Sequence, residues 1–228
     1  MMKTFSLPFG KGTQTVSLDE AHVLYDLHGN PVDAVADEQE AIRQALRHPI
    51  GSAPLKDVVQ AGDTVAIIVS DITRLVHTAQ MLPVIVDELN QAGVRDEQIT
   101  VVTAQGTHRA HRPEEDVIVC GEDMVKRVKV VSHDCRDASQ LTKIGTTTHG
   151  NDVYLDSHVV QADKVILTGA VSFHPMAGFG GGRKAVLPGV ASYETIMRNH
   201  AMALTDTFGG GCNPRCETSL LEDNPLHD

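Results

Sequence analysis

The 228-residue sequence contains no tryptophan, and aromatic residues make up only 4% of it. This shortage argues against a surface that stacks nucleic-acid bases or sugars on aromatic rings. Basic residues are also few, because 19 Lys and Arg stand against 30 Asp and Glu, which gives a net charge of -11. Nucleic acid binding depends on a basic face, so we expect no nucleic-acid partner. A small anionic ligand is still allowed, since a local basic pocket can exist in an acidic protein.

Long apolar runs are missing as well. No stretch approaches the ~20 apolar residues that span a bilayer, and the first residues lack the apolar core of a signal peptide. The four cysteines are too few for a disulfide framework in a chain of this length. We therefore expect a cytoplasmic protein with reduced thiols and no membrane partner.

Short β-rich runs alternate with helical patterns over most of the chain. The runs that predict strands lie at residues 65–69, 99–103, 128–131 and 165–168. Residues 5–24 alternate around Gly10-Lys-Gly12 and predict a hairpin, whereas residues 33–48 and 82–89 and the segment from Pro113 predict helices. The predicted fold class is α/β: a Rossmann-like, largely parallel sheet with flanking helices and a small N-terminal β-hairpin.

Polar residues follow each of the four predicted strands. The segments are Ser70–Arg74, Gln105–Arg109, Ser132–Cys135 and Ser172–His174. In open α/β sheets the functional residues lie just past the carboxyl ends of the strands. Four strand ends that carry Asp, Arg and His therefore predict a functional site at one edge of the sheet.

A glycine-rich loop runs Gly178-Phe-Gly-Gly-Gly-Arg-Lys184. Its backbone N–H groups can approach a phosphate, with Arg183 and Lys184 beside it. The loop differs from a Walker A loop, because Arg183 precedes the lysine and Ala185 follows it, and it lies too late in the chain for a dinucleotide fingerprint. We favour a nucleotide-like phosphate ligand over a flexible turn. Lys184 is also a candidate for covalent attachment of a cofactor.

Two of the 12 histidines, His108 and His174, follow predicted strands among small residues and are candidates for catalysis. His200 lies on a helix predicted to start near Tyr193, and periodicity alone does not separate it from a surface residue. No histidine pair has zinc-site spacing, so the residues support at most a one-histidine or dispersed metal site. Imidazole does suit nickel.

The motif Asp71-Ile-Thr-Arg74 has two readings. A guanidinium at a strand end can clamp a carboxylate with two hydrogen bonds, and a neighbouring Asp71 can orient it. The same motif, taken alone, is equally compatible with a surface ion pair.

Together these segments resemble the lactate racemase family, over nearly the whole chain. The matching segments are Leu7–Gly12, Asp71–Arg74, Gly106–Arg109, Ser172–Gly189 and Arg198–His200, of which the long glycine-containing block is the most specific. The resemblance implies a racemase or epimerase of a small 2-hydroxy acid that works by transient hydride transfer to a nickel-pincer nucleotide. This cofactor is a pyridinium-3,5-bisthiocarboxylic acid mononucleotide with nickel.

The resemblance also implies a role for each candidate residue. Lys184 would carry the cofactor covalently, and His200 would supply a nickel ligand. His108 and His174 would be paired general bases on opposite faces of the substrate, and Arg74 would hold the substrate carboxylate. The other implied cofactor-binding residues are Asp71, Gly178, Gly180, Gly181 and Gly182. The implied partners are the 2-hydroxy acid and the proteins that make the cofactor and insert nickel.

Two departures from the family pattern bear on these expectations. Leu75 stands where the family usually has proline, and family members are about twice as long, as two-domain proteins of this kind are. We therefore predict a cofactor-binding domain over residues 1–206 and a linker or tail over 207–228 that leads to an absent C-terminal domain. The alternative is a non-catalytic module that binds a nucleotide or a hydroxy acid. A phosphotransferase is disfavoured, since no Ser or Thr follows Lys184.

Overall fold

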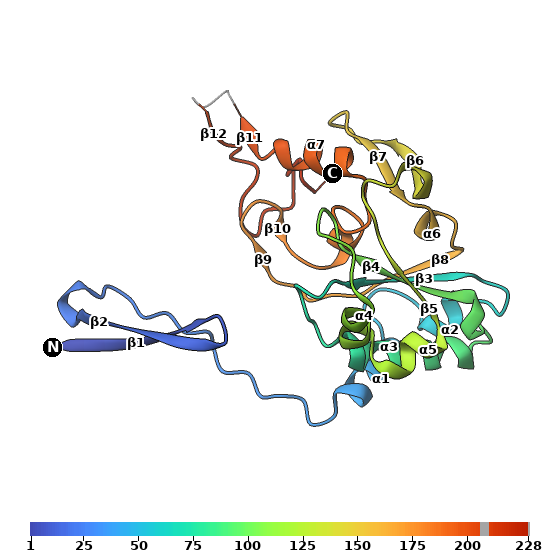
Figure 1. The fold of residues 1–228 in the computed structure, drawn as a ribbon, viewed down its shortest axis with the longest axis horizontal. Helices are drawn as coiled ribbons and strands as arrows, with labels where there is room; N and C mark the ends of the chain where they lie inside the picture. The colour runs from blue at the N-terminus through green and yellow to red at the C-terminus, as the bar shows by residue number, and fades with distance from the viewer. Residues whose placement is uncertain (206–209, 228) are drawn as a thin grey trace. The chain divides into compact units, whose positions relative to one another are not determined.

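The computed structural model describes residues 1–205 and 210–227, which form two compact units, Met1–Ala36 and Asp37–Asp228 (Figure 1). The first unit is an antiparallel hairpin of β1 (Met2–Phe9) and β2 (Gly12–Asp19), followed by the short helix η1 (Glu20–His22). Gly10 turns the hairpin with a φ of 58° that favours glycine. The predicted N-terminal hairpin is thereby confirmed.

The second unit is built on a parallel sheet with the strand order β5-β4-β3-β8. Its strands are β3 (Val65–Ser70), β4 (Ile99–Ala104), β5 (Lys129–Ser132) and β8 (Lys164–Leu167). The chain leaves the central strand β3 on one side and returns to β8 on the other, so the topological switch lies between β3 and β8. Ligands of open α/β sheets bind at such a point. The four predicted strands and the α/β class are confirmed.

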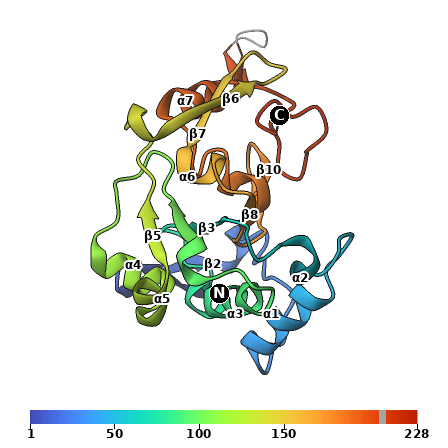
Figure 2. The ribbon, with the colours of Figure 1, turned by 90° about the vertical axis from the view of Figure 1, so that its right-hand side faces the viewer.

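Apolar side chains cover both faces of this sheet, and helices lie on both sides of it in Figure 2. On one face, Val65, Ile67 and Val69 pack against a layer of helices. These helices are α1 (Glu38–Arg47), α2 (Leu55–Val58), α3 (Thr78–Gln91), α4 (Pro113–Cys120) and α5 (Glu122–Arg127). The alternate residues Ala66 and Ile68 face the opposite layer, because successive side chains of a strand point to opposite faces. This second layer contains α6 (Ser157–Val160) and η4 (Gly182–Ala185).

Two predicted helices differ at their ends. Helix α1 begins at Glu38 rather than at residue 33, because the Asp37 side chain accepts the backbone N–H of Glu40 and caps the helix. Helix α3 begins at Thr78, before the predicted start at residue 82, and includes Pro83.

A hairpin that the sequence pattern did not indicate supports the last helix of the chain. It consists of β6 (Leu141–Thr146) and β7 (Asp152–Asp156), and it contacts α7 (Tyr193–Ala201). The Thr195 hydroxyl donates to the Asp152 carbonyl and accepts from the Tyr154 N–H. Ser192 caps α7 by accepting the Thr195 N–H, which places the helix start next to the hairpin.

The last described residues pack against the loop that follows β8. This loop contains the two-residue strands β9 (Phe173–His174) and β10 (Gly178–Phe179), and beyond α7 lie β11 (Leu204–Thr205) and β12 (Gly211–Cys212). A small apolar cluster joins Ala177, Ala203, Cys216 and Leu226. The predicted division after residue 206 lies outside the described residues. Within residues 1–205 and 210–227, no helix is both long and apolar enough to cross a membrane.

Candidate active site

A cavity of about 600 Å³ opens at the carboxyl ends of β3, β4 and β8. It lies at the topological switch, and its volume is in the usual range for a site that binds a small molecule or cofactor. Segments from three predicted strand ends, the glycine-rich loop and α7 line it. The predicted site residues among the lining are Asp71, Arg74, His108, His174, Gly180, Gly181, Lys184 and His200.

Asp71 and His108 form a hydrogen-bonded pair on the wall of the cavity. The buried Asp71 accepts from His108 Nδ1 at 2.6 Å through Oδ2, while its Oδ1 accepts the N–H and the hydroxyl of Thr73. Because the carboxylate accepts a hydrogen bond from Nδ1, the imidazole proton stays on Nδ1 and Nε2 keeps a lone pair. His108 is half-exposed and is thus prepared to act as a base.

His111 holds the loop that carries Asp71. Its Nδ1–H donates to Asp116, and its Nε2 accepts the backbone N–H of Ile72 at 2.9 Å. Only 1% of the His111 side chain is exposed. Nothing in the sequence pattern separates His111 from the other histidines, and its part in shaping the loop follows from tertiary contact alone.

His174 and Lys184 meet in the lining of the cavity. His174 Nδ1 accepts the backbone N–H groups of Met176 and Ala177 at 3.2 and 3.0 Å. Its Nε2 lies 3.2 Å from Lys184 Nζ. Burial, followed by the nearby charges of Lys184 and Arg74, lowers the pKa of His174.

Burial also lowers the pKa of Lys184, from an ordinary value of 10.5 to about 8, and Arg183 and Arg74 add to the effect. At pH 7 about a tenth of the amine is therefore uncharged, far more than for an ordinary lysine. A neutral amine is the nucleophilic form of lysine, so this position suits covalent attachment of an electrophilic group.

The four predicted glycines divide into two pairs. Gly180 and Gly181 line the cavity, and a Cβ at Gly181 would lie 2.7 Å from the Ala170 carbonyl oxygen. Gly178 lies outside the lining, and its missing side chain makes room for Leu220, whose carbonyl oxygen would be 2.5 Å from a Cβ. Gly182 also lies outside the lining and starts η4.

Arg183 braces the loop instead of facing the cavity. Its guanidinium donates to the Ala177 carbonyl at 3.1 Å and to the Leu226 carbonyl at 3.3 Å. The expectation that Arg183 and Lys184 together flank a phosphate is therefore wrong for Arg183. Lys184 lines the cavity, whereas Arg183 does not.

Arg74 lines the cavity and is exposed to solvent. Its backbone N–H donates to the Asp71 carbonyl, which turns the chain after β3. Its guanidinium has no hydrogen-bond or ion-pair partner within residues 1–205 and 210–227, so the surface ion pair with Asp71 is absent there. An unengaged guanidinium beside a cavity can bind a carboxylate through two hydrogen bonds.

His200 reaches the cavity from α7. Its Nδ1 lies 3.0 Å from the Ile196 carbonyl oxygen, so Nδ1 carries the donated proton and Nε2 keeps a lone pair. Burial lowers the pKa of His200 and favours the neutral ring that ligates metals. In the part of the chain that the structure describes, no group of three or more His, Cys, Asp or Glu side chains could hold a metal ion. A metal here would find a single imidazole with a fixed orientation.

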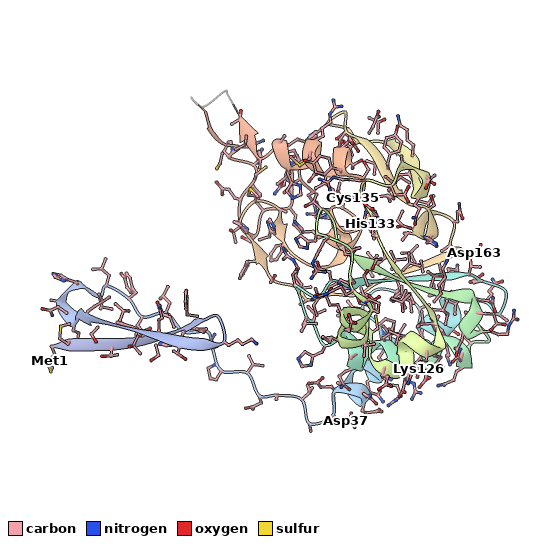
Figure 3. All side chains as sticks on the ribbon, viewed as in Figure 1. Met1, Asp37, Lys126, His133, Cys135 and Asp163 are labelled. Carbon is pink, nitrogen blue, oxygen red and sulfur yellow. The ribbon has the colours of Figure 1, made fainter. Side chains whose placement is uncertain are left out.

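The third predicted strand end, Ser132–Cys135, does not join the site. His133, which follows β5 and is labelled in Figure 3, is 1% exposed. Its Nδ1 is 3.0 Å from Asp156 Oδ2, and its Nε2 is 2.9 Å from the Ala191 carbonyl oxygen. Burial would raise the pKa of Asp156, but the hydrogen bonds from His133 and His158 outweigh it and lower the pKa. His133 is a structural residue that ties β5 to the start of α7.

Arg109, like His133, has a structural role. It forms two hydrogen bonds of 2.7 Å with the Glu115 carboxylate at the start of α4, and these contacts hold the pKa of Glu115 well below its usual range.

Asp71 is the one acidic residue among the lining of the described cavity, and its carboxylate already has partners. The cavity is thus locally basic in a chain of net charge -11, which suits an anionic ligand.

Comparison with known proteins shows the family of the chain. The family model described as the lactate racemase N-terminal domain matches residues 9–209. The lactate racemase of Lactiplantibacillus plantarum is 34% identical, and that of Thermoanaerobacterium thermosaccharolyticum is 31% identical; each alignment covers 99% of this chain and 52% of the relative. The chain thus spans about half the length of these curated relatives.

Solved structures agree with this comparison. The lactate racemase apoprotein from T. thermosaccharolyticum superposes with a TM-score of 0.84 over 99% of this chain and 51% of its own. A Thermotoga maritima protein of 21% identity shares the fold, with a TM-score of 0.56 over 89% of this chain and 47% of its own. By sequence and by fold, the chain belongs to the lactate racemase family and corresponds to its N-terminal domain.

Proposed function

We propose that the protein containing this chain is a racemase or epimerase of a small 2-hydroxy acid such as lactate, and that it uses a nickel-pincer nucleotide. The observation that carries the proposal is the set of side chains that line one cavity. The oriented base His108, a second histidine and an unengaged Arg74 face it together with a lysine of lowered pKa. The names of the relatives, both lactate racemases, support the choice of substrate class.

The residues present fit the cofactor. Lys184 offers a partly neutral amine at physiological pH, which can form an amide-type bond with a carboxyl-derived group. His200 offers Nε2 as a lone-pair donor, because its Nδ1–H is held by the Ile196 carbonyl. Gly180 and Gly181 leave the wall beside Lys184 free of side chains. When bound, the group supplies a hydride acceptor that interconverts a 2-hydroxy acid with its planar keto acid.

The chain's own residues then bind the substrate and move its proton. Arg74 binds the carboxylate with two hydrogen bonds, and this contact fixes the hydroxyl-bearing carbon in the cavity. His108 Nε2 takes the hydroxyl proton, and Asp71 stabilises the imidazolium that forms. His174 serves the other face of the planar acid, where it returns a proton to the oxygen. One histidine for each face allows both enantiomers to be formed.

The location and the partners follow from the same proposal. All four cysteines are free, which agrees with a reducing compartment, and we place the protein in the cytoplasm. We also propose residues 1–206 as the cofactor-binding domain, and the relatives, of which this chain covers 52%, support a second domain that completes the site. Proteins that build the cofactor and insert nickel must act on this domain before turnover.

The test is to express the whole protein with the cofactor-making proteins and to measure the intact mass, the nickel content and racemisation. We expect an adduct on Lys184, bound nickel and turnover. Lys184→Ala should lose the adduct and the nickel, and His200→Ala should keep the adduct but retain less nickel. His108→Ala should keep both and lose turnover. His48→Ala, at the exposed end of α1, is the matched control and should resemble the unaltered protein.

The proposal fails if the unaltered protein, matured in this way, has an unmodified Lys184 and no nickel. Binding of a 2-hydroxy acid by calorimetry without racemisation would instead identify a non-catalytic binding module.

A further inference from the structure

The C-terminal residues 218–226 lie directly on the loop that carries His174 and Lys184. Thr218 forms a parallel bridge with Gly178, and the Ser219 N–H donates to the Gly178 carbonyl at 3.0 Å. The approach is so close that a Cβ at Gly178 would be 2.5 Å from the Leu220 carbonyl oxygen. The loop that holds two predicted site residues is therefore shaped by a segment far along the chain.

Asn224 is the buried polar residue of this contact, with 3% of its surface exposed. Its Nδ2 donates to the Met176 carbonyl and to the Leu220 carbonyl, both at 2.9 Å. Its Oδ1 accepts the Leu226 N–H at 3.0 Å. All three contacts require the amide in this orientation, because the reverse would set the oxygen against two carbonyls. These three hydrogen bonds fix the Asn224 side chain and the backbone groups that it contacts.

The ring of His174 is held through its Nδ1 atom. Two backbone N–H groups, of Met176 and Ala177, point at Nδ1, so this atom accepts and carries no proton. The proton of the neutral ring then lies on Nε2, which is 3.2 Å from Lys184 Nζ. Above about pH 8 the Lys184 amine is mostly neutral, and its lone pair can then accept that proton in a hydrogen bond.

One peptide group connects the two residues. Its C=O is that of Met176, which accepts from Asn224, and its N–H is that of Ala177, which donates to His174. The C=O and N–H of a trans peptide point in opposite directions, so fixing the carbonyl aims the N–H. The hydrogen bond to the carbonyl also polarises the peptide and strengthens the bond made by its N–H.

We propose that Asn224 is a positioning residue for His174, which it holds, through the peptide between Met176 and Ala177, in the tautomer with the proton on Nε2. In the racemase reaction, on which this consequence rests, the two histidines then start in opposite states. His108 presents a lone pair on Nε2 that can accept a proton, whereas His174 presents an Nε2–H that can donate a hydrogen bond to the substrate oxygen.

The test reads the tautomer directly. The chain is labelled with ¹⁵N in its histidine rings, long-range ¹H–¹⁵N spectra are recorded at pH 8, and His174→Gln assigns the signals. We expect an unprotonated, hydrogen-bonded Nδ1 and a protonated Nε2 in the unaltered chain. Asn224→Asp has the same shape but sets a carboxylate against the Met176 and Leu220 carbonyls. It should lose the single-tautomer signature and speed the exchange of the Ala177 amide.

The matched control is Asn90→Asp at the end of α3. It also replaces an amide that donates to a backbone carbonyl, that of Val94, but it lies apart from the cavity lining. It should leave the His174 signals unchanged even if it lowers stability. The spectra need neither substrate nor cofactor, so their outcome is separate from that of the racemase test.

The proposal is overturned if His174 in the unaltered chain carries its proton on Nδ1. It is also overturned if Asn224→Asp or Asn224→Ala folds and keeps a single Nε2-protonated tautomer. Should neither variant fold, the tautomer of the unaltered chain decides. In the whole protein, Asn224→Ala should lower kcat about tenfold with little change in KM, the pattern of a misplaced hydrogen-bond donor that acts in the transition state.

Discussion

The Nδ1 atom of His108 lies 2.6 Å from Oδ2 of the buried Asp71, whose other oxygen accepts two hydrogen bonds from Thr73. This arrangement determines both the position of the imidazole and the place of its proton. Sequence spacing puts the two residues 37 positions apart, on different strand ends. Their meeting is a property of the parallel sheet.

Asp71→Asn should lower kcat by about 10²–10⁴-fold. The two donors of Thr73 would claim the amide oxygen, so the amide nitrogen would face His108 and donate to Nδ1. The imidazole proton would then move to Nε2, where the base is needed. Racemisation kinetics of the whole matured protein measure the effect. Thr73→Val, which leaves the contact between Asp71 and His108 in place, is the control, and equal losses in the two variants would contradict the prediction.

The amine of Lys184 should react with an acylating reagent with a midpoint near pH 8, where its pKa lies. Burial, together with the charges of Arg183 and Arg74, favours the neutral form. Peptide mass spectrometry over a pH series measures the extent of labelling. Lys126, exposed on α5 and labelled in Figure 3, serves as the internal reference. A Lys184 profile with its midpoint near 10.5 would refute the lowered pKa.

The lowered pKa of Lys184 should also make the free energy of unfolding depend on pH. Between about pH 8 and 10.5 the unfolded chain keeps a proton on Lys184 that the folded chain has released, so the free energy of unfolding rises with pH through this window. Lys184→Met should remove that rise. Urea unfolding at several pH values gives the slope, and an unchanged slope in the variant would contradict the assignment.

Gly181→Ala should destabilise the chain more than Gly182→Ala. Both residues have a φ that disfavours alanine, 74° and 51°, which costs about 1 kcal/mol. At Gly181 the new Cβ would also meet the Ala170 carbonyl oxygen at 2.7 Å, whereas at Gly182 nothing lies within 4 Å. We expect a loss of about 2–4 kcal/mol for Gly181→Ala and about 1 kcal/mol for Gly182→Ala. Chemical denaturation of both variants measures the difference, and equal losses would show that the loop relaxes.

Asp156→Asn should cost about 3–5 kcal/mol of unfolding free energy, because it leaves the buried His133 without its charged partner. The folded pKa of Asp156 is lowered, so the stabilisation is complete above the ordinary value of 3.8 and is lost as the pH falls through the lower folded value. Unfolding free energies between pH 3 and 7 test both statements. Asp57→Asn, on exposed α2, should change neither the free energy nor its pH dependence.

The strands and the hairpin could be predicted because their signals are local. Apolar runs such as 65–69 and the alternation around Gly10 depend on neighbouring residues, and the structure confirms them. The hairpin of β6 and β7 was not predicted, since β6 is largely exposed and β7 is only 5 residues long. The end of β5 was wrongly assigned to the site, because a histidine after a strand gives no sign of whether it faces a cavity or the core.

The sequence by itself determined the class of fold, the edge of the sheet that carries the site, and the glycine-rich loop with its lysine. Periodicity, turn chemistry and the order of strands are properties of neighbouring residues, so they can be read along the chain. Only the tertiary structure decided which side chains meet. It paired His108 with Asp71, turned Arg183 away from the cavity and set Asn224 behind His174. Such contacts join residues far apart in the chain, and hydrogen bonds over about 3 Å depend on packing that no local pattern contains.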